Sequence, residues 1–220
     1  HVSLAGVAAG LILQTAPILT ALPFAVAGAL LLEYLRQNKR LSGDTSLALL
    51  MSGGLAVAGV LAGLAGGKQG DFNAYLFGSI TTTSSQDVWL LALVSFVILA
   101  LVGLNYRALV HVAFNEDSAR IAGYKVTALN YMLSAATAVM VVLCLRIVGG
   151  LLVGALLVIP VVAAGRLAHS FLRTQLYAVA IALIGVVVGL VLAFYAGVAA
   201  GGAIVIVTLC IFGMSLISRD

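Results

Sequence analysis

Charged residues are scarce in this chain. They make up 8% of its 220 residues, whereas hydrophobic residues make up 63% and the mean hydropathy is +1.22. Soluble domains carry about 25% charged residues, so a soluble globular fold is excluded and an integral membrane protein is expected. The two cysteines, Cys144 and Cys210, lie inside apolar runs and are interpreted as reduced packing residues. The net charge of +4 gives no sign of a nucleic-acid partner, and none is expected.

Motifs for covalent chemistry are also missing. The chain has no GxxxxGK[ST] phosphate loop, no GxSxG nucleophile elbow and no HExxH zinc motif, so it is not expected to be an enzyme. Any ATP hydrolysis must then come from a separate polypeptide. An ion-driven carrier should hold carboxylates in mid-span, which disfavours that class here. All acidic residues instead lie at or near span ends or in loops: Glu33, Asp44, Asp71, Asp87, Glu116, Asp117 and Asp220.

What the chain does have is a series of long apolar runs. A spanning helix needs about 20 mostly apolar residues. We predict an all-α polytopic transmembrane bundle, forming a single domain over residues 1–220, with seven complete spans and one partial span at 1–13. The complete spans are predicted at 16–35, 44–65, 88–105, 126–145, 147–165, 174–196 and 199–217. Because the chain begins at His1 inside an apolar run, an N-terminal part is expected to be missing.

Two residue types refine these helices. Pro160 predicts that the span at 147–165 is shorter or kinked, because proline removes a backbone hydrogen bond and clashes with the preceding turn. The chain also contains 24 glycines, some of them four residues apart, a spacing that lets helix backbones approach closely in lipid. The pairs are Gly59 and Gly63, Gly150 and Gly154, and Gly185 and Gly189.

The distribution of basic residues predicts the orientation. Nine of the eleven lysines and arginines fall on one side if the connections at 36–43, 106–125 and 166–173 and the end at 218–220 share a side. Only Lys68 and Arg146 fall on the other side. Positive residues concentrate in cytoplasmic loops, so the first set is predicted to be cytoplasmic and the polar connection 66–87 external. A membrane location with several passes is expected.

The segment 114–125, FNEDSARIAGYK, is a polar island with helix signals at both ends. Asn115 is a good N-cap, and the acidic residues Glu116 and Asp117 follow in the first turn, where the helix dipole favours negative charge. Gly123 suits a C-terminal residue with positive φ. Residues 116–122 should form about two helical turns, roughly 10 Å long at ~1.5 Å per residue.

The same segment predicts a docking surface. Ala119, Ala122 and Gly123 are expected to lie on one face of small residues, which the surface of another protein could approach closely. We therefore interpret 116–122 as a short cytoplasmic helix that docks a partner, while the surrounding spans move in response.

His1 is the first residue of a predicted membrane segment, where an ionisable side chain is least expected. A neutral imidazole nitrogen is a good ligand for Zn²⁺ or Mn²⁺, so His1 is a candidate metal contact. An interfacial histidine or a cloning remnant are the alternatives. Met51, Met132 and Met140 are interpreted as packing residues, because they do not cluster with one another in the sequence.

Five segments together resemble a known family, the permease subunits of bacterial ABC importers for zinc, manganese or iron ions. They occur in the family's order and span nearly the whole chain. The run ALLVIPVVAAGRLA leans towards the zinc members. The matching segments are HVSLAG (1–6), AYLFGSI (74–80), FNEDSARIAG (114–123), VGGLLVGALLVIPVVAAGRLA (148–168) and GGAIVI (201–206).

The resemblance implies partners and residue roles. It implies a permease dimer, expected to be a homodimer, with cytoplasmic ABC ATPases and an extracytoplasmic metal-binding protein. His1 falls on the family's membrane histidine, whose aspartate partner would precede residue 1. No cofactor is permanently bound, and Zn²⁺ or Mn²⁺ passes through transiently. The helix at 115–123 would couple to the ATPase through Asn115, Glu116, Asp117, Ala119 and Gly123, and Gly149, Gly150 and Pro160 would form a pathway or hinge region.

This sequence departs from the family pattern at two places. Asn115 stands where the family has Asp, and Val161-Val162 stand where it has Ala-Ala after the proline. The predicted function is an importer permease for a divalent transition-metal ion, zinc before manganese, working by alternating access. The alternatives are a permease for a metal chelate or cofactor, an ion-coupled secondary carrier, and a membrane scaffold without flux.

Overall fold

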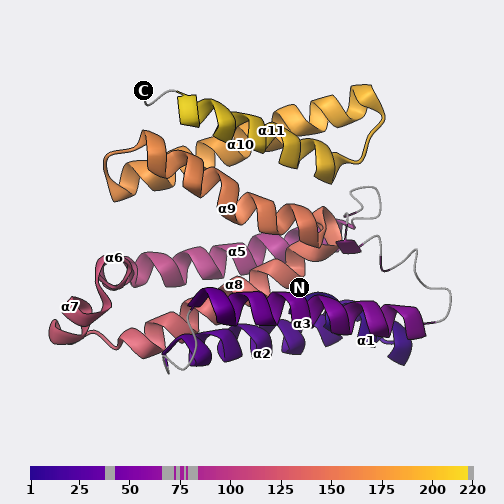
Figure 1. Cartoon of the computed structure of the whole chain (residues 1–220), viewed down its shortest axis with the longest axis horizontal. Coiled ribbons are helices and arrows are strands. Elements are labelled where there is room, and N and C mark those ends of the chain that lie inside the picture. The colour runs from indigo at the N-terminus through magenta and orange to yellow at the C-terminus, as the bar shows by residue number, and fades with distance from the viewer. Residues whose placement is uncertain (38–42, 66–71, 73–74, 77, 79–83, 218–220) are drawn as a thin grey trace. The chain divides into compact units, whose positions relative to one another are not determined.

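The computed structural model describes residues 1–37, 43–65, 72, 75–76, 78 and 84–217, and this part of the chain is helical without any strand (Figure 1). The all-α prediction is therefore confirmed. The chain divides into two compact units. Unit 1 comprises residues 1–72 and 81–146, and unit 2 comprises residues 73–80 and 147–220.

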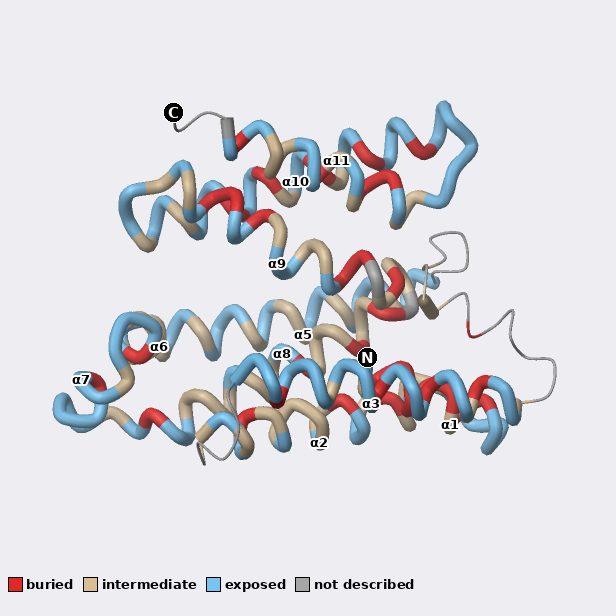
Figure 2. The backbone as a smooth tube through the Cα atoms, in the orientation of Figure 1, coloured by how far each residue is buried: buried red, intermediate tan, exposed pale blue. Residues whose placement is uncertain are grey.

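Unit 1 is built around a short buried helix. Its helices are α1 (Val2–Leu13), α2 (Pro17–Gln37), α3 (Gly43–Leu64), α5 (Ser85–Leu104), α6 (Tyr106–Phe114), α7 (Glu116–Ile121) and most of α8 (Val126–Val148). α1 packs against α2 and α3, and most of its residues are buried (Figure 2). By contrast α5, which is described in full, has no buried residue. Gln14 ends α1 in a left-handed conformation with φ 54°.

Small residues allow α1 its close contacts. A Cβ atom on Gly6 would lie 2.7 Å from the Cα of Ala21 on α2, and one on Gly54 of α3 would lie 2.8 Å from the backbone nitrogen of Val2. Both distances are too short for any side chain larger than hydrogen. Helix backbones that approach this closely gain dispersion contacts, which replace the hydrophobic drive in lipid.

Unit 2 is a layer of three mutually packed helices, α9 (Gly150–Leu167), α10 (Phe171–Ala196) and α11 (Ala200–Ile217). Ala163 and Ala164 of α9 form a core with Ala178 and Ile181 of α10. Ser170 caps α10 by accepting a hydrogen bond from the backbone N–H of Arg173, and Gly197 ends that helix with φ 65°.

Glycine spacing has different outcomes in the two units. A Cβ atom on Gly189 of α10 would lie 2.6 Å from the Cα of Ile204 on α11, and one on Gly185 would clash with the side chain of Thr208. Here the predicted close approach is confirmed. A Cβ atom on Gly59 or Gly63 of α3 would meet no atom of the described chain within 4 Å, so the same spacing makes no helix contact there.

The apolar helices coincide with the eight predicted segments, but their lengths do not confirm seven complete spans. Within the described residues, five helices are long and apolar enough to cross a membrane: α2, α3, α5, the Val126–Leu145 part of α8, and α10. Three apolar stretches are shorter: Val2–Leu13, Leu152–Leu167 and Ala200–Leu216. α9 runs through Pro160 as a single helix of 18 residues, so a shortened or kinked span at this position stays a prediction.

Candidate coupling helix and transport cavity

The ends of α7 are fixed by the caps that the sequence predicts. The Asn115 side chain accepts a hydrogen bond from the backbone N–H of Ser118 at 3.0 Å, which satisfies one of the unpaired donors of the first turn. At the other end, Gly123 has φ 87°. The N–H of Gly123 donates to the carbonyl of Arg120 at 3.0 Å, and the N–H of Tyr124 donates to that of Ala119 at 3.1 Å. This pair of bonds is the Schellman motif.

One side of α7 is buried within unit 1. Ala119 is completely buried against Val112 of α6 and Val126 of α8, with Tyr124 and Leu129 packed around this cluster. The expectation that Ala119, Ala122 and Gly123 share one accessible face is therefore wrong for Ala119, whose small side chain lets α7 sit against its own chain. Ala122 and Gly123 are exposed.

The other side of α7 is open. Ile121 is 90% exposed, and Phe114, immediately before the cap, is 73% exposed. Asp117 and Arg120 are also exposed. Two large apolar side chains beside charged ones make a surface suited to a protein partner, since exposed apolar groups on a short polar element are costly in water.

The N-terminal turn of α7 is tied to α2 and α8 by polar contacts. Glu116 Oε1 accepts from Arg36 Nη2 of α2 at 2.8 Å and from Asn130 Nδ2 of α8 at 3.2 Å. Arg36 also binds Glu33 through two hydrogen bonds, from Nη2 to Oε1 at 2.9 Å and from Nε to Oε2 at 3.1 Å. Sequence reasoning missed this link; its only signal was that the end of α2 and α7 share the predicted cytoplasmic side.

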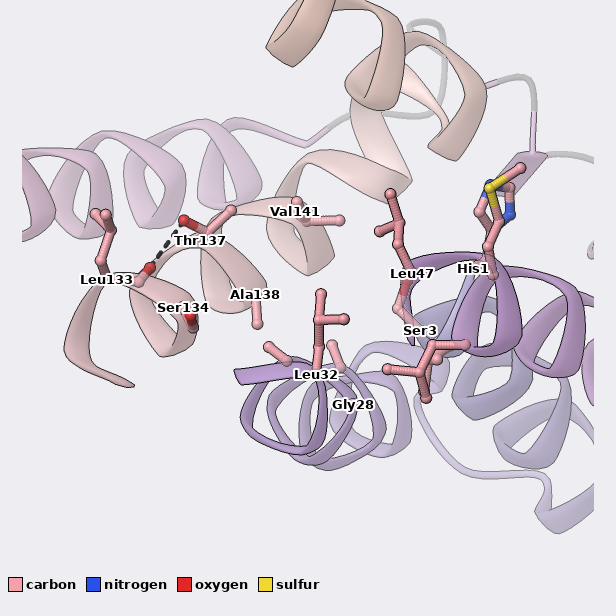
Figure 3. Close-up of a pocket in the computed structure, with 15 residues that line it drawn as sticks. His1, Ser3, Gly28, Leu32, Leu47, Leu133, Ser134, Thr137, Ala138 and Val141 are labelled. Carbon is pink, nitrogen blue, oxygen red and sulfur yellow. Dashed lines mark hydrogen bonds between the residues drawn. The ribbon is translucent and has the colours of Figure 1, made fainter. Parts of the chain in front are cut away.

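A cavity of about 430 Å³ lies within unit 1 between α1, α2, α3 and α8 (Figure 3). Ala138 and Val141 of α8 face Leu32 of α2 and Leu47 of α3 across it. His1 is part of the lining. The other lining groups with donor or acceptor atoms in their side chains are Met51, Ser3, Ser134 and Thr137.

The chemistry of this lining suits weak, transient contact with a cation. Among the lining side chains, the His1 imidazole is the strongest ligand for such a cation, and the hydroxyl oxygens and the Met51 thioether are weaker ones. The Thr137 hydroxyl donates to the Leu133 carbonyl at 2.8 Å, which leaves its lone pairs available. Within the described residues, no carboxylate or thiol lines the cavity, and no three His, Cys, Asp or Glu side chains are grouped to hold a metal.

Two of the three predicted hinge residues, Gly149 and Gly150, lie where α8 ends and α9 begins, whereas Pro160 does not. Gly149 has φ 87° and separates α8 from α9, which begins at Gly150. Gly78, with φ 77°, packs so closely on Val148 and Gly149 that a Cβ atom there would clash with their backbone. Most of the predicted segment 74–80 otherwise lies outside the described residues. Pro160 is inside α9 and is fully buried.

Comparison with known proteins places these features in a family. The sequence pattern of the ABC 3 transport family matches residues 1–219. A probable metal transport system membrane protein of Treponema pallidum is 32% identical over 213 residues, which cover 96% of this chain and 79% of the relative. The high-affinity zinc uptake system membrane protein ZnuB of Haemophilus influenzae is 26% identical, covering 100% of this chain and 84% of the relative. Other relatives are named for manganese transport or import.

A solved structure agrees with the sequence comparison. The chain resembles PsaBC from Streptococcus pneumoniae, solved in complex with Fab, with a TM-score of 0.83 and 27% identity over 98% of this chain and 77% of that one. Together with the apolar helices, these similarities confirm a multi-pass membrane transport subunit rather than an enzyme. The match over nearly its whole length shows that the chain belongs to the ABC 3 transport family.

Proposed function

We propose that this chain is the permease subunit of an ATP-binding-cassette importer that moves a divalent transition-metal ion into the cytoplasm across a bacterial inner membrane. The observation that carries the proposal is the family match over residues 1–219, with relatives named for metal, zinc and manganese transport. Both units belong to one permease domain in this proposal. Zinc is favoured over manganese because the run around Pro160 leans towards the zinc members.

In the proposed mechanism, α7 transmits the movement of the ATPase to the permease. The exposed face of α7, which includes Ile121 and Gly123, binds in a groove on the surface of a separate cytoplasmic ATPase. The capped ends of α7 support this role, because a helix fixed at both termini moves as a rigid body and transmits displacement. ATP binding then opens the pathway outward, and hydrolysis resets it inward.

His1 is proposed to contact the ion during passage. The cavity that His1 lines is mainly apolar, and one imidazole with hydroxyl and thioether neighbours would bind a cation loosely enough to release it. The glycine break at Gly149-Gly150 and the buried Pro160 would let α9 tilt as access alternates. A second permease copy and an extracytoplasmic metal-binding protein complete the proposed assembly.

The role of His1 predicts a specific loss. His1→Ala in the full-length protein should lower zinc uptake at least about tenfold, because removing a group that organises a metal site typically costs 10–100-fold in affinity or activity. Initial uptake of radioactive zinc at several concentrations measures the effect. The matched control is His169→Ala, because His169 is exposed between α9 and α10. Equal uptake by both variants would remove His1 from the path.

The function itself is tested by reconstitution. The permease, its ATPase and the binding protein are placed in proteoliposomes, and uptake of free zinc, free manganese and a chelated metal is followed with and without ATP. We expect ATP-dependent uptake of a free ion, unaffected by a protonophore. Uptake of the chelate alone would identify a chelate importer, and uptake that collapses with the protonophore and needs no ATPase would identify an ion-coupled carrier. Absence of any flux would identify a scaffold.

A further inference from the structure

Arg36 stands between two carboxylates that come from different helices. Its guanidinium binds Glu33 of its own helix, and Nη2 also reaches Glu116 Oε1 of α7 at 2.8 Å. Glu116 lies 80 positions further along the chain and is the first residue of α7. A planar guanidinium suits this bridging, because its donors point in fixed directions and it stays charged at any accessible pH.

Glu33 holds Arg36 in place for this contact. Its side chain is only 8% exposed, and it accepts both arginine bonds as well as one from Gln37 Nε2 at 2.8 Å. A buried carboxylate with three charge-assisted or amide hydrogen bonds is strongly oriented. The side chain of Arg36 is 41% exposed and that of Glu116 is 35% exposed, so the Arg36–Glu116 contact alone would be an ordinary surface ion pair. The anchoring by Glu33 distinguishes this cluster from such a pair.

The cluster also contacts two of the four helices that wall the cavity. Leu32 precedes Glu33 on α2 and lines the cavity, and Leu133, one helical turn after Asn130, lines it from α8. Thus Glu116 bonds to α2 through Arg36 and to α8 through Asn130, each one helical turn from a cavity-lining residue. A displacement of the first turn of α7 would therefore act on both of these helices.

We propose that Arg36 is a positioning residue that couples movement of α7 to the walls of the transport cavity, with Glu33 as its anchor and Glu116 as its contact on α7. This inference rests on the proposed function, in which α7 meets the ATPase. The apolar contact of Ala119 keeps α7 attached to unit 1, while the contact between Arg36 and Glu116 determines the direction in which a displaced α7 moves α2. Loss of the bridge therefore leaves an assembled complex that hydrolyses ATP without moving the ion efficiently.

The test measures ions transported per ATP hydrolysed in the reconstituted complex. Arg36→Gln should lower this ratio at least about fivefold, the lower end of typical coupling between sites, while the amount of assembled ATPase is maintained. Glu116→Gln should lower the ratio similarly, measured per assembled complex because Glu116 is also a predicted ATPase contact. The double variant should be no worse than either single one, because residues in one network are not additive. The matched control is Arg173→Gln, an exposed arginine of α10, which should keep the wild-type ratio.

Further variants separate this inference from simple destabilisation. Arg36→Lys keeps the positive charge but loses the two-pronged contact with Glu33, so we expect an intermediate ratio. If Arg36→Gln fails to assemble, the lysine variant decides: a wild-type ratio overturns the inference, and an intermediate ratio supports it.

Failure of this inference differs from failure of the proposed function. If the wild-type complex shows no ATP-dependent uptake, the proposed function is wrong. If the wild type transports and Arg36→Gln, assembled normally, keeps the wild-type ratio of ions to ATP, the coupling role of Arg36 is wrong and the proposed function stands.

Discussion

The short helix α7 and the helix pair α10–α11 are held in place by opposite means. α7 has six residues, and its position depends on caps at both ends, one buried alanine and hydrogen bonds from Arg36 and Asn130. α10 and α11 have 26 and 18 residues and touch through Gly189 and Gly185, where backbone and side chain meet without space for a Cβ atom.

We infer from this difference that α7 moves during the transport cycle, whereas α10 and α11 support the fold. Tight packing of small residues has a single good arrangement and resists displacement. Polar contacts at a capped, half-exposed helix can break and re-form one at a time, at a cost of about 1 kcal/mol each. We therefore expect damage to α10–α11 to reduce folding, and damage to α7 to reduce coupling while the fold persists.

The largest expected effect comes from filling the α10–α11 contact. Gly189→Leu places a side chain where a Cβ atom already lies 2.6 Å from the Cα of Ile204, so the helices must separate. Overpacking of this kind costs about 1–3 kcal/mol. Thermal unfolding in detergent should show a clear drop in Tm. Gly59→Leu is the control, because a Cβ atom at Gly59 meets nothing within 4 Å of the described chain; equal losses would contradict the comparison.

A smaller effect on folding, but a large one on docking, is expected at Gly123. Gly123→Trp adds bulk to the exposed end of α7 and forces a side chain into a φ of 87°, so capture of the ATPase should fall while the permease remains folded. Co-purification of the two subunits measures this. Gly123→Asn is the matched variant, because asparagine tolerates left-handed backbone, and it should retain most of the ATPase. Full capture by the tryptophan variant would show that this end of α7 does not dock.

The smallest expected effect is at the N-cap of α7. Asn115→Ala removes the acceptor for the Ser118 N–H and should destabilise α7 locally by about 1 kcal/mol. Hydrogen exchange at α7 should quicken without a change in α10. Asn115→Asp keeps the acceptor and adds a charge that the helix dipole favours, so exchange should be no faster than in the original protein. Faster exchange in the aspartate variant would show that the cap is not what holds this turn.

Local signals allowed the ends of α7 to be predicted from the sequence. Asn115 and Gly123 act through their own backbone and that of the next few residues, so their roles follow from residue type and spacing. The eight apolar segments were predictable for the same reason. The number of complete spans stays a prediction, because five helices of the described chain are long and apolar enough to cross a membrane.

Contacts between distant segments could not be predicted. Gly185-Gly189 and Gly59-Gly63 have the same spacing, yet only the first pair faces another helix closely. Ala119 is small because α6 and α8 lie against it, which the sequence of α7 alone does not reveal. The Arg36–Glu116 contact joins residues that are 80 positions apart, so charge patterning predicts the shared side but not the pairing.

Crosslinking tests directly whether the ATPase docks on α7. A photo-crosslinking residue is placed at Ile121, which is 90% exposed, and for comparison at Tyr195, which is 83% exposed at the C-terminal end of α10. In an assembled complex that takes up zinc, we expect a crosslink to the ATPase from position 121 and none from position 195. An active complex that crosslinks from neither position, or only from 195, would contradict the assignment of α7 as the coupling helix.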